Sequence, residues 1–395
     1  MSTKRFRLTK ASKILIMVLV IALIGGGVFA GVKTGLIKTK SNTSISNAGN
    51  KVTGTTSSSS NKKKANSDGT INLSLDEWIG WKSIIDANGG LTTQPDSIYG
   101  KLGINVNINV INDATQSSNA LIKGDLNAAG YTINRTAFLS QKFTEAGEDV
   151  IMPYITNYSN GGDGIIAKSS INSVKDLVGA KIGVPEFSEA QTLVIWFVNN
   201  SDLSDDEKSD IIDNLVLFST ADDTAKAFFA GQVDVAATWE PYLTQAQNMT
   251  DAHVLFSTAS STNLVMDGIL FDKNFAEAYP EIVEKFVQGS LEASDMYDNE
   301  FTAIREVMPM FNTASDEDIA GSAATAKLTT WKDNSDLLNG TAKTIYSDMC
   351  NVWTSIGETV NADLVDTIFD DTYINAIADK FNATDCLLYT SPSPR

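Results

Sequence analysis

The chain has 395 residues, of which 43% are hydrophobic, and this size suits two domains of ordinary length. The formal net charge of −18 hides an asymmetry, because residues 1–64 contain twelve Lys and Arg and no Asp or Glu. The remainder carries 18 basic and 48 acidic side chains, a balance that argues against nucleic acid as a partner, because its phosphates would be repelled. The acidic body fits a soluble extracytoplasmic protein, although solubility alone would also explain it.

Residues 1–37 predict a basic cytoplasmic start followed by a signal or transmembrane helix. Ile14 to Val32 form a run of 19 apolar residues, which can span a bilayer, and five basic residues precede the run. The positive-inside rule places the rest of the chain outside the cytoplasm. Two outcomes stay open: a membrane anchor, favoured by the length of the run, and a signal peptide cleaved after Val28-Phe29-Ala30, which would leave a secreted or periplasmic body.

Two further segments are expected to lie outside the folded body. Residues 38–69 consist of Ser, Thr, Asn, Gly and Lys with almost nothing to bury, which predicts a flexible linker. The last ten residues, 386–395, read CLLYTSPSPR and resemble a transposase sequencing adapter translated in frame, so we interpret them as a scar. On that interpretation Cys350 is the only native cysteine, no disulfide is expected, and the natural gene is expected to continue beyond residue 385.

From Thr70 onward, segments with strand character alternate with segments of helical periodicity. In chain order, the predicted strands are INLSLDEW, VNINVIND, AAGY, KIGVP, NLVLFST and VDVAAT. The predicted helices between them are SSNALIKG, SEAQTLVIWFVNN and DDTAKAFFAG. This alternation predicts an α/β body with largely parallel sheets, and from Lys273 on the chain is predicted to be mostly helical.

Two segments about a hundred residues apart share one frame. In both LIKGDLNAAGY and FFAGQVDVAAT a helix end is followed by Gly, a polar residue and a short strand of small residues. Gly124 therefore aligns with Gly231, and Asn127 aligns with Asp234. A strand that ends on small residues lets a ligand or another backbone come close, so the repeat predicts two similar lobes around a shared cleft.

The tripeptide Asp-Gly-Ile also occurs twice, starting at Asp163 and at Asp267, and an apolar pair follows it each time. We interpret the two segments as strands that cross between the lobes. Lobe one is then predicted to comprise residues 70–162 plus 268–385, and lobe two residues 163–267.

Four segments give the chain a resemblance to the substrate-binding proteins of ABC importers, in particular to the nitrate, taurine and sulfonate group. They are ALIKGDLNAAGYTINRTAFL, INSVKDLVGAKIGVPEFSEAQTL, DDTAKAFFAGQVDVAATWEPYL and FDKNFAEAYPEIVEKFVQGSLEA. The resemblance implies an α/β fold of the two-lobed type II periplasmic-binding-protein (Venus flytrap) class with two crossover strands. It also implies the capture of a small solute between the lobes and its delivery to ABC permease and ATPase subunits.

In proteins of this kind the ligand contacts loops that follow the carboxyl ends of strands. By position, the resemblance implies ligand contacts from Asp76, Trp78, Thr132, Asn134, Arg135, Asp163, Ser188, Gln191, Trp239, Glu240 and Asp267. Trp239 and Glu240 are expected to face a loop at Thr132–Arg135 across the cleft. Ser188 and Gln191 also have a structural interpretation, because Ser-x-x-Gln is a helix-capping box.

The chemistry of these residues favours a zwitterionic or amine-bearing solute over a plain oxyanion. One arginine suits a carboxylate or phosphonate, whereas carboxylates and aromatic faces suit an ammonium or a planar ring. Glu186 and Glu189 lie beside the start of a predicted helix, where they would oppose a free anion. In this respect the sequence departs from what a nitrate or sulfonate binder is expected to contain.

No enzymatic activity, cofactor or metal is expected. His253 is the only histidine, so any Ser-His-Asp triad would have to use it, and we interpret it as structural. The sequence contains no His/Cys cluster for a metal ion. The acidic segment SDLSDDEKSD lacks the Gly and the final Glu of a calcium-binding loop. The alternative that stays open is a sensory module, in which the same lobes would report the ligand to a membrane partner.

Overall fold

The computed structural model describes residues 68–261, 264–296 and 298–381. The predicted membrane or signal helix, most of the predicted linker and the adapter-like end lie outside these residues. Within the described ranges, no helix is both long and apolar enough to cross a membrane.

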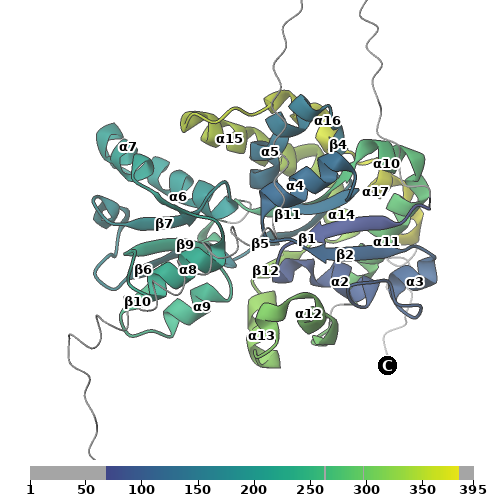
Figure 1. Cartoon of the computed structure of the whole chain (residues 1–395), viewed down its shortest axis with the longest axis horizontal. Helices are drawn as coiled ribbons and strands as arrows, with labels where there is room; N and C mark the ends of the chain where they lie inside the picture. Colours follow the sequence, from purple (N-terminus) through teal and green to yellow (C-terminus); the bar gives the residue numbers. More distant parts are fainter. Residues whose placement is uncertain (1–67, 262–263, 297, 382–395) are drawn as a thin grey trace, which may run out of the picture. The chain divides into compact units, whose positions relative to one another are not determined.

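The described strands form two sheets (Figure 1). The seven-stranded sheet has the order β12-β5-β11-β3-β1-β2, and β4 pairs with β11 beside this path. Its strands are β1 (Ile71–Leu75), β2 (Val106–Val110), β3 (Ala128–Thr132), β4 (Val150–Ile151), β5 (Ile155–Ser159), β11 (Met266–Asp272) and β12 (Ala326–Leu328). The five-stranded sheet, in the order β10-β6-β9-β7-β8, contains β6 (Asp163–Lys168), β7 (Ile182–Pro185), β8 (Val216–Phe218), β9 (Val235–Trp239) and β10 (Ala252–Ser257).

The sheets are mixed, which corrects the prediction that they are largely parallel. β1 runs parallel to β2 and β3, and β7 runs parallel to β8 and β9. β6 and β11 are antiparallel to all their partners. In the chain, each of these two strands follows a strand of the other sheet. It therefore begins beside the carboxyl ends of the parallel strands and runs in the opposite direction to them. The boundaries of the two lobes, residues 70–162 plus 268–385 and residues 163–267, remain a prediction.

Helices cover both sheets and make up most of the chain after Lys273, as the sequence predicts. The helices before that point are α2 (Lys82–Asn88), α3 (Ile98–Leu102), α4 (Ala114–Lys123), α5 (Ile133–Ala146), α6 (Glu189–Asn199), α7 (Asp205–Asp213), α8 (Ala221–Phe229) and α9 (Tyr242–Gln247). Those after it are α10 (Lys273–Ala278), α11 (Pro280–Asp295), α12 (Thr302–Val307), α13 (Asp316–Ala323), α14 (Trp331–Asp336), α15 (Ala342–Ser355), α16 (Val365–Ile368) and α17 (Thr372–Ala376). α15 packs against α5 and also contacts α6 beside the other sheet.

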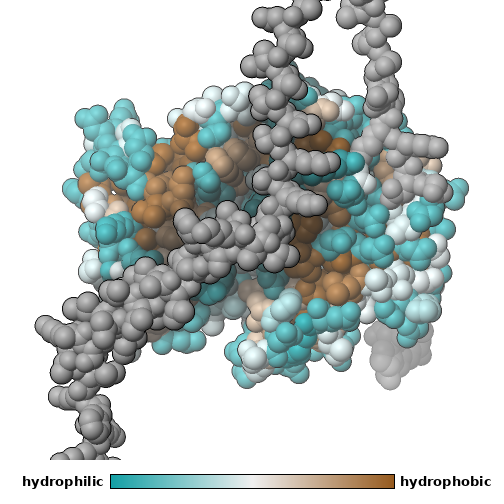
Figure 2. Space-filling model, in the orientation of Figure 1, coloured by the Kyte–Doolittle hydropathy of each residue, from teal (hydrophilic) through white to brown (hydrophobic). Residues whose placement is uncertain are grey.

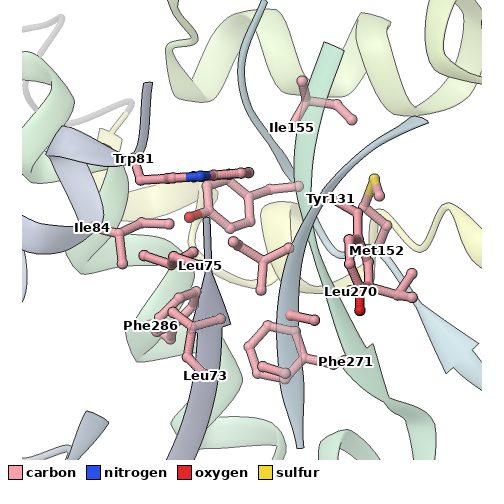
Figure 3. Close-up of a cluster of buried hydrophobic side chains, with 14 of the residues drawn as sticks. Leu73, Leu75, Trp81, Ile84, Tyr131, Met152, Ile155, Leu270, Phe271 and Phe286 are labelled. Atoms are coloured by element: carbon pink, nitrogen blue, oxygen red, sulfur yellow. The ribbon is translucent and has the colours of Figure 1, made fainter. Parts of the chain in front are cut away.

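The largest hydrophobic core lies around the seven-stranded sheet. Figure 3 shows Leu73 of β1 and Phe271 of β11 among its side chains, together with Ile84 of α2 and Phe286 of α11. Separate apolar clusters cover the two faces of the five-stranded sheet. On the face seen in Figure 2, apolar residues gather over α6 and β7, and hydrophilic residues surround them.

The two aligned segments have the same local geometry. Gly124 and Gly231 both have positive φ, 83° and 71°, a conformation that glycine adopts without steric cost at a helix end. Asn127 accepts a hydrogen bond from the backbone N–H of Asn72 at 2.9 Å, and Asp234 accepts one from the backbone N–H of Lys181 at 3.1 Å. Each side chain therefore ties its strand to the start of the neighbouring parallel strand.

Candidate functional site

Strand register brings predicted site residues together in pairs. On β6, Asp163 lies opposite Trp239, the last residue of β9. On β11, Asp267 lies opposite Thr132, the last residue of β3. β3 and β9 belong to different sheets. At the carboxyl end of each lies a pair of side chains: Thr132 with Asp267 of the neighbouring β11, and Trp239 with Asp163 of the neighbouring β6.

These pairs line a small cavity that we call the inner chamber. Its volume is about 20 Å³, and its lining residues are Asp76, Trp78, Thr132, Asp163, Glu189, Trp239, Val265 and Asp267. The sequence predicted six of these eight residues as ligand contacts. Four of the eight are carboxylates: Asp163 and Asp267 lie on strands of different sheets, Asp76 follows β1, and Glu189 begins α6.

Arg135 neutralises two of the four carboxylates. Its guanidinium lies 3.2 Å from Asp76 and 3.2 Å from Glu189, and the Thr132 hydroxyl also donates to Glu189 at 3.2 Å. Burial opposes the charge of Arg135, which is 6% exposed, but the carboxylates of Glu189 and Asp76 hold its pKa above the ordinary value. The positive charge of Arg135 is therefore already shared between two buried partners.

Asp163 and Asp267 have no such partner. Both are 3% exposed, and neither forms an ion pair with any residue that the structure describes. Burial, and next the charge of Glu189, raise the pKa of Asp163 to about 8. Burial, followed by the charge of Asp163, raises the pKa of Asp267 well above its ordinary value, although Trp78 Nε1 donates a hydrogen bond to Asp267 at 3.1 Å.

A larger cavity of about 740 Å³, which we call the outer cavity, adjoins the inner chamber through Asp76 and Trp239, which line both. Its acidic lining residues are Asp76, Glu77, Asp113, Glu186, Asp222 and Asp223. Arg135 is the only basic residue among the described residues that line it. Phe138 and Phe187 form an aromatic wall, with stacked rings whose centroids are 4.2 Å apart.

The structure changes the expected loop at Thr132–Arg135. Thr132 ends β3 and caps α5, its hydroxyl accepting from the backbone N–H of Arg135 at 3.0 Å. Asn134 and Arg135 thus lie in the first turn of a helix, not in a loop. The Asn134 amide nitrogen donates to Thr192 at 2.8 Å, and its buried oxygen has no hydrogen-bond partner among the described residues. Asn134 lines neither the inner chamber nor the outer cavity.

Three other predicted residues mainly cap helices. Ser188 lines the outer cavity and caps α6, accepting from the backbone N–H of Gln191 at 3.2 Å. Gln191 accepts from the backbone N–H of Phe187 at 2.7 Å and lies outside both cavities. Glu240 also lies outside them, and it accepts from the backbone N–H of Thr244 at 3.1 Å at the start of α9.

The predicted set of ligand contacts lacks Glu189, which the sequence indicated only as a carboxylate opposing an anion at a helix start, and it lacks the aromatic wall. Glu189 directly follows the cap residue Ser188, and that position at a helix start was the available signal. Phe138 lies three residues after Arg135, on the same face of α5. Phe187 has a positive φ of 56°, which is unusual for a bulky residue and which no sequence pattern indicated.

The described residues contain no group of three or more His, Cys, Asp or Glu side chains that could hold a metal ion. Of the four carboxylates of the inner chamber, Asp76 and Glu189 pair with Arg135, and Asp163 and Asp267 line the chamber without a cationic partner among the described residues. In chemical terms they can accept hydrogen bonds from a cation, and the indoles of Trp78 and Trp239 can cover its apolar part.

Comparisons with known proteins agree with the two-sheet arrangement. The aliphatic sulphonate-binding protein SsuA of Escherichia coli is 15% identical, with a TM-score of 0.57 over 77% of this chain and 98% of that chain. The alkanesulfonate-binding protein SsuA of Xanthomonas axonopodis, bound to MOPS, is 14% identical, with a TM-score of 0.58 over 76% and 99%. The nitrate-binding protein NrtA of Synechocystis PCC 6803 is 10% identical, with a TM-score of 0.57 over 80% and 90%.

At these identities the likeness shows a shared fold, that of the periplasmic binding proteins, as the sequence predicted. These solved proteins are described as binding proteins and not as enzymes. No curated protein sequence matches the chain. A family model described as NMT1/THI5-like matches residues 98–299, which is more than half of the chain. The chain therefore belongs to the NMT1/THI5-like family.

Proposed function

We propose that this protein is an extracytoplasmic solute-binding protein that captures an amine-bearing small molecule in the inner chamber and outer cavity. The observation that carries the proposal is the imbalance of charge around the inner chamber. Asp76, Asp163, Glu189 and Asp267 line it, and Arg135 is the one cation in contact with any of them among the described residues. A cationic group on the solute would complete the charge balance.

An anionic solute fits this arrangement less well. Arg135 would have to leave two buried carboxylates in order to bind a sulfonate or carboxylate, and uncompensated buried charges are costly. The same argument disfavours a zwitterion whose acid group needs Arg135. An ammonium group meets no such conflict, and Trp78 and Trp239 offer aromatic faces to the carbon atoms around it.

The helix N-termini at the cavities give independent support. Helix starts attract anions, because their free N–H groups and the helix dipole are positive. Here, however, α4 is capped by Asp113, α6 begins with Glu189, and Asp222 and Asp223 occupy the first turn of α8. Each of these positive ends therefore already has its own carboxylate.

Family membership supports delivery of the solute to the permease and ATPase of an ABC importer. Structural neighbours include a ligand-binding component of an ABC-type import system from Staphylococcus aureus, which is 11% identical with a TM-score of 0.55. The basic start and apolar run in residues 1–37 support a body outside the cytoplasm, anchored or released by cleavage. The family and the expected location together support a role in import.

Thermal unfolding of the purified protein against a panel of solutes tests the proposed ligand class. The panel holds primary amines, polyamines, betaines and amino acids beside taurine, alkyl sulfonates and nitrate. An amine present at about a hundred times its dissociation constant should add about 2.7 kcal/mol to the free energy of unfolding. Stabilisation by sulfonates or nitrate alone would contradict the proposal while leaving the family unchanged.

A further inference from the structure

We infer that the inner chamber is a subsite for a single primary ammonium group, so that the solute is a primary amine whose body extends into the outer cavity. This inference rests on the proposed function and makes it more specific. It separates primary amines from quaternary ammonium solutes such as betaines, which carry the same charge on a much larger group.

The size of the chamber is the first argument. A cavity needs roughly 10–15 Å³ of space for the centre of one water molecule. The inner chamber has about 20 Å³ of such space and is lined by Trp78, Trp239 and Val265 together with the polar residues. It therefore accepts one group of about the size of water. A primary ammonium has this size, whereas a trimethylammonium group has three additional carbon atoms.

The second argument is a buried acceptor that lacks a cationic partner. Asp163 lines the chamber, is 3% exposed and forms no ion pair within the described part of the chain. Burial and the charge of Glu189 raise the pKa of Asp163, and the neighbouring Ser159 hydroxyl, which also shares a hydrogen bond with Thr258 at 2.8 Å, offsets this only in part. Asp163 is therefore a buried acid with no cation beside it among the described residues, and an ammonium group in the chamber would stabilise its carboxylate form.

The number of hydrogen-bond donors is the third argument. A primary ammonium has three donors, and a quaternary ammonium has none. Asp163 and Asp267 offer carboxylate oxygens, and Asp267 receives one hydrogen bond from Trp78 at 3.1 Å. Since unpaired buried polar groups are costly, a group that donates to both aspartates is favoured over one that only brings charge.

The shared lining residues define where the rest of the solute lies. Asp76 and Trp239 border both the inner chamber and the outer cavity, so a chain attached to the ammonium passes between them. The outer cavity of about 740 Å³ can hold a small-molecule body. Its stacked Phe138 and Phe187 rings favour an apolar or aromatic one.

Isothermal titration calorimetry on the unmodified protein tests the subsite. The probes are n-butylamine, 1,4-diaminobutane and 2-phenylethylamine, each compared with its N-trimethylated counterpart. At least one primary amine should bind, and it should bind at least about tenfold more tightly than its trimethylated counterpart, which lacks the donors. Equal or tighter binding of the trimethylated form would overturn the subsite while the cationic-solute function stands.

Two variants locate the effect. Asp163→Asn removes the carboxyl group that would ionise beside the ammonium, with little change of shape, and should weaken binding of the primary amine by about tenfold or more. Asp206→Asn is the matched control, because Asp206 is an exposed acidic residue in the first turn of α7 that lines neither cavity, and the affinity of this variant for the amine should stay within about twofold. An unchanged affinity in Asp163→Asn would overturn the subsite. If no amine binds in either form but a sulfonate does, the proposed function fails as well.

Discussion

Asp163 is the residue at which burial has its clearest measurable consequence. Its pKa rises from 3.8 to about 8 because the carboxylate is buried and lies near the charge of Glu189. Between about pH 4 and pH 8 the folded protein therefore holds a proton on Asp163 that the unfolded chain releases. The free energy of unfolding should fall as the pH rises through this window, by up to about 1.4 kcal/mol per pH unit.

Asp163→Asn should remove this contribution, because the amide does not titrate. We expect a flatter dependence of the unfolding free energy on pH between pH 5 and 8, and a variant more stable than the unmodified protein at pH 8. Some slope should remain, because the pKa of Asp267 is raised in the same direction. Urea unfolding at four pH values measures the effect.

Asp176→Asn provides the control for this titration. Asp176 lies in an exposed capping box, where the hydrogen bonds of Asn172 and Ser173 lower its pKa. Its contribution to stability is present above the unfolded pKa and is lost only at more acidic pH, so the slope between pH 5 and 8 should not change. An identical slope in the Asp163 variant and the unmodified protein would show that Asp163 is already ionised.

At the scale of elements, β6 and β11 share an Asp-Gly start that is packed too tightly for any side chain. A Cβ atom on Gly164 would lie 2.6 Å from the carbonyl oxygen of Phe256. A Cβ atom on Gly268 would lie 2.4 Å from Met152 Sδ and 3.0 Å from the carbonyl oxygen of Tyr154. The two glycines thus allow each strand to pack closely, immediately after an aspartate of the inner chamber.

Gly164→Ala and Gly268→Ala should each lower the free energy of unfolding by about 2 kcal/mol, because the added methyl group overpacks a buried strand. Gly321→Ala is the control. Gly321 lies in α13 with open space around its Cβ position, so alanine should be neutral or slightly stabilising. Denaturant unfolding compares the three variants, and equal stabilities would show that the strands shift to make room.

At the scale of the whole molecule, the net charge of −18 creates a field that attracts cations. On the proposed route, a solute would pass the acidic lining of the outer cavity before it reaches the inner chamber. Salt screens such a field, since the Debye length falls to about 10 Å at 0.1 M. The rate at which a cationic solute associates should therefore depend on ionic strength.

The association rate constant of a primary amine should fall about tenfold between about 20 mM and 500 mM NaCl. Stopped-flow fluorescence measures this rate, because Trp78 and Trp239 line the inner chamber. Quenching by acrylamide, which is uncharged, serves as the control and should not respond to salt. A rate constant that rises with salt would indicate an anionic solute and contradict the proposed function.

The sequence by itself determined many of the elements and the positions of several residues at the strand ends. Strand periodicity placed β1, β7 and β9, and glycine marked the helix ends at Gly124 and Gly231, because these features depend on the conformation of a few neighbouring residues. The repeated Asp-Gly-Ile segment indicated Asp163 and Asp267 together, and both line the inner chamber.

Only the tertiary structure decided which side chains face one another. Arg135 contacts Asp76 and Glu189, which lie 59 and 54 residues away along the chain. These two carboxylates already neutralise the guanidinium, so it is not available to bind a solute anion. β12 pairs with β5, which lies more than 150 residues earlier in the chain, and no local sequence pattern predicted this pairing. The size of the inner chamber likewise depends on the packing of both sheets. Such contacts join residues that are distant along the chain, and local propensities contain no information about them.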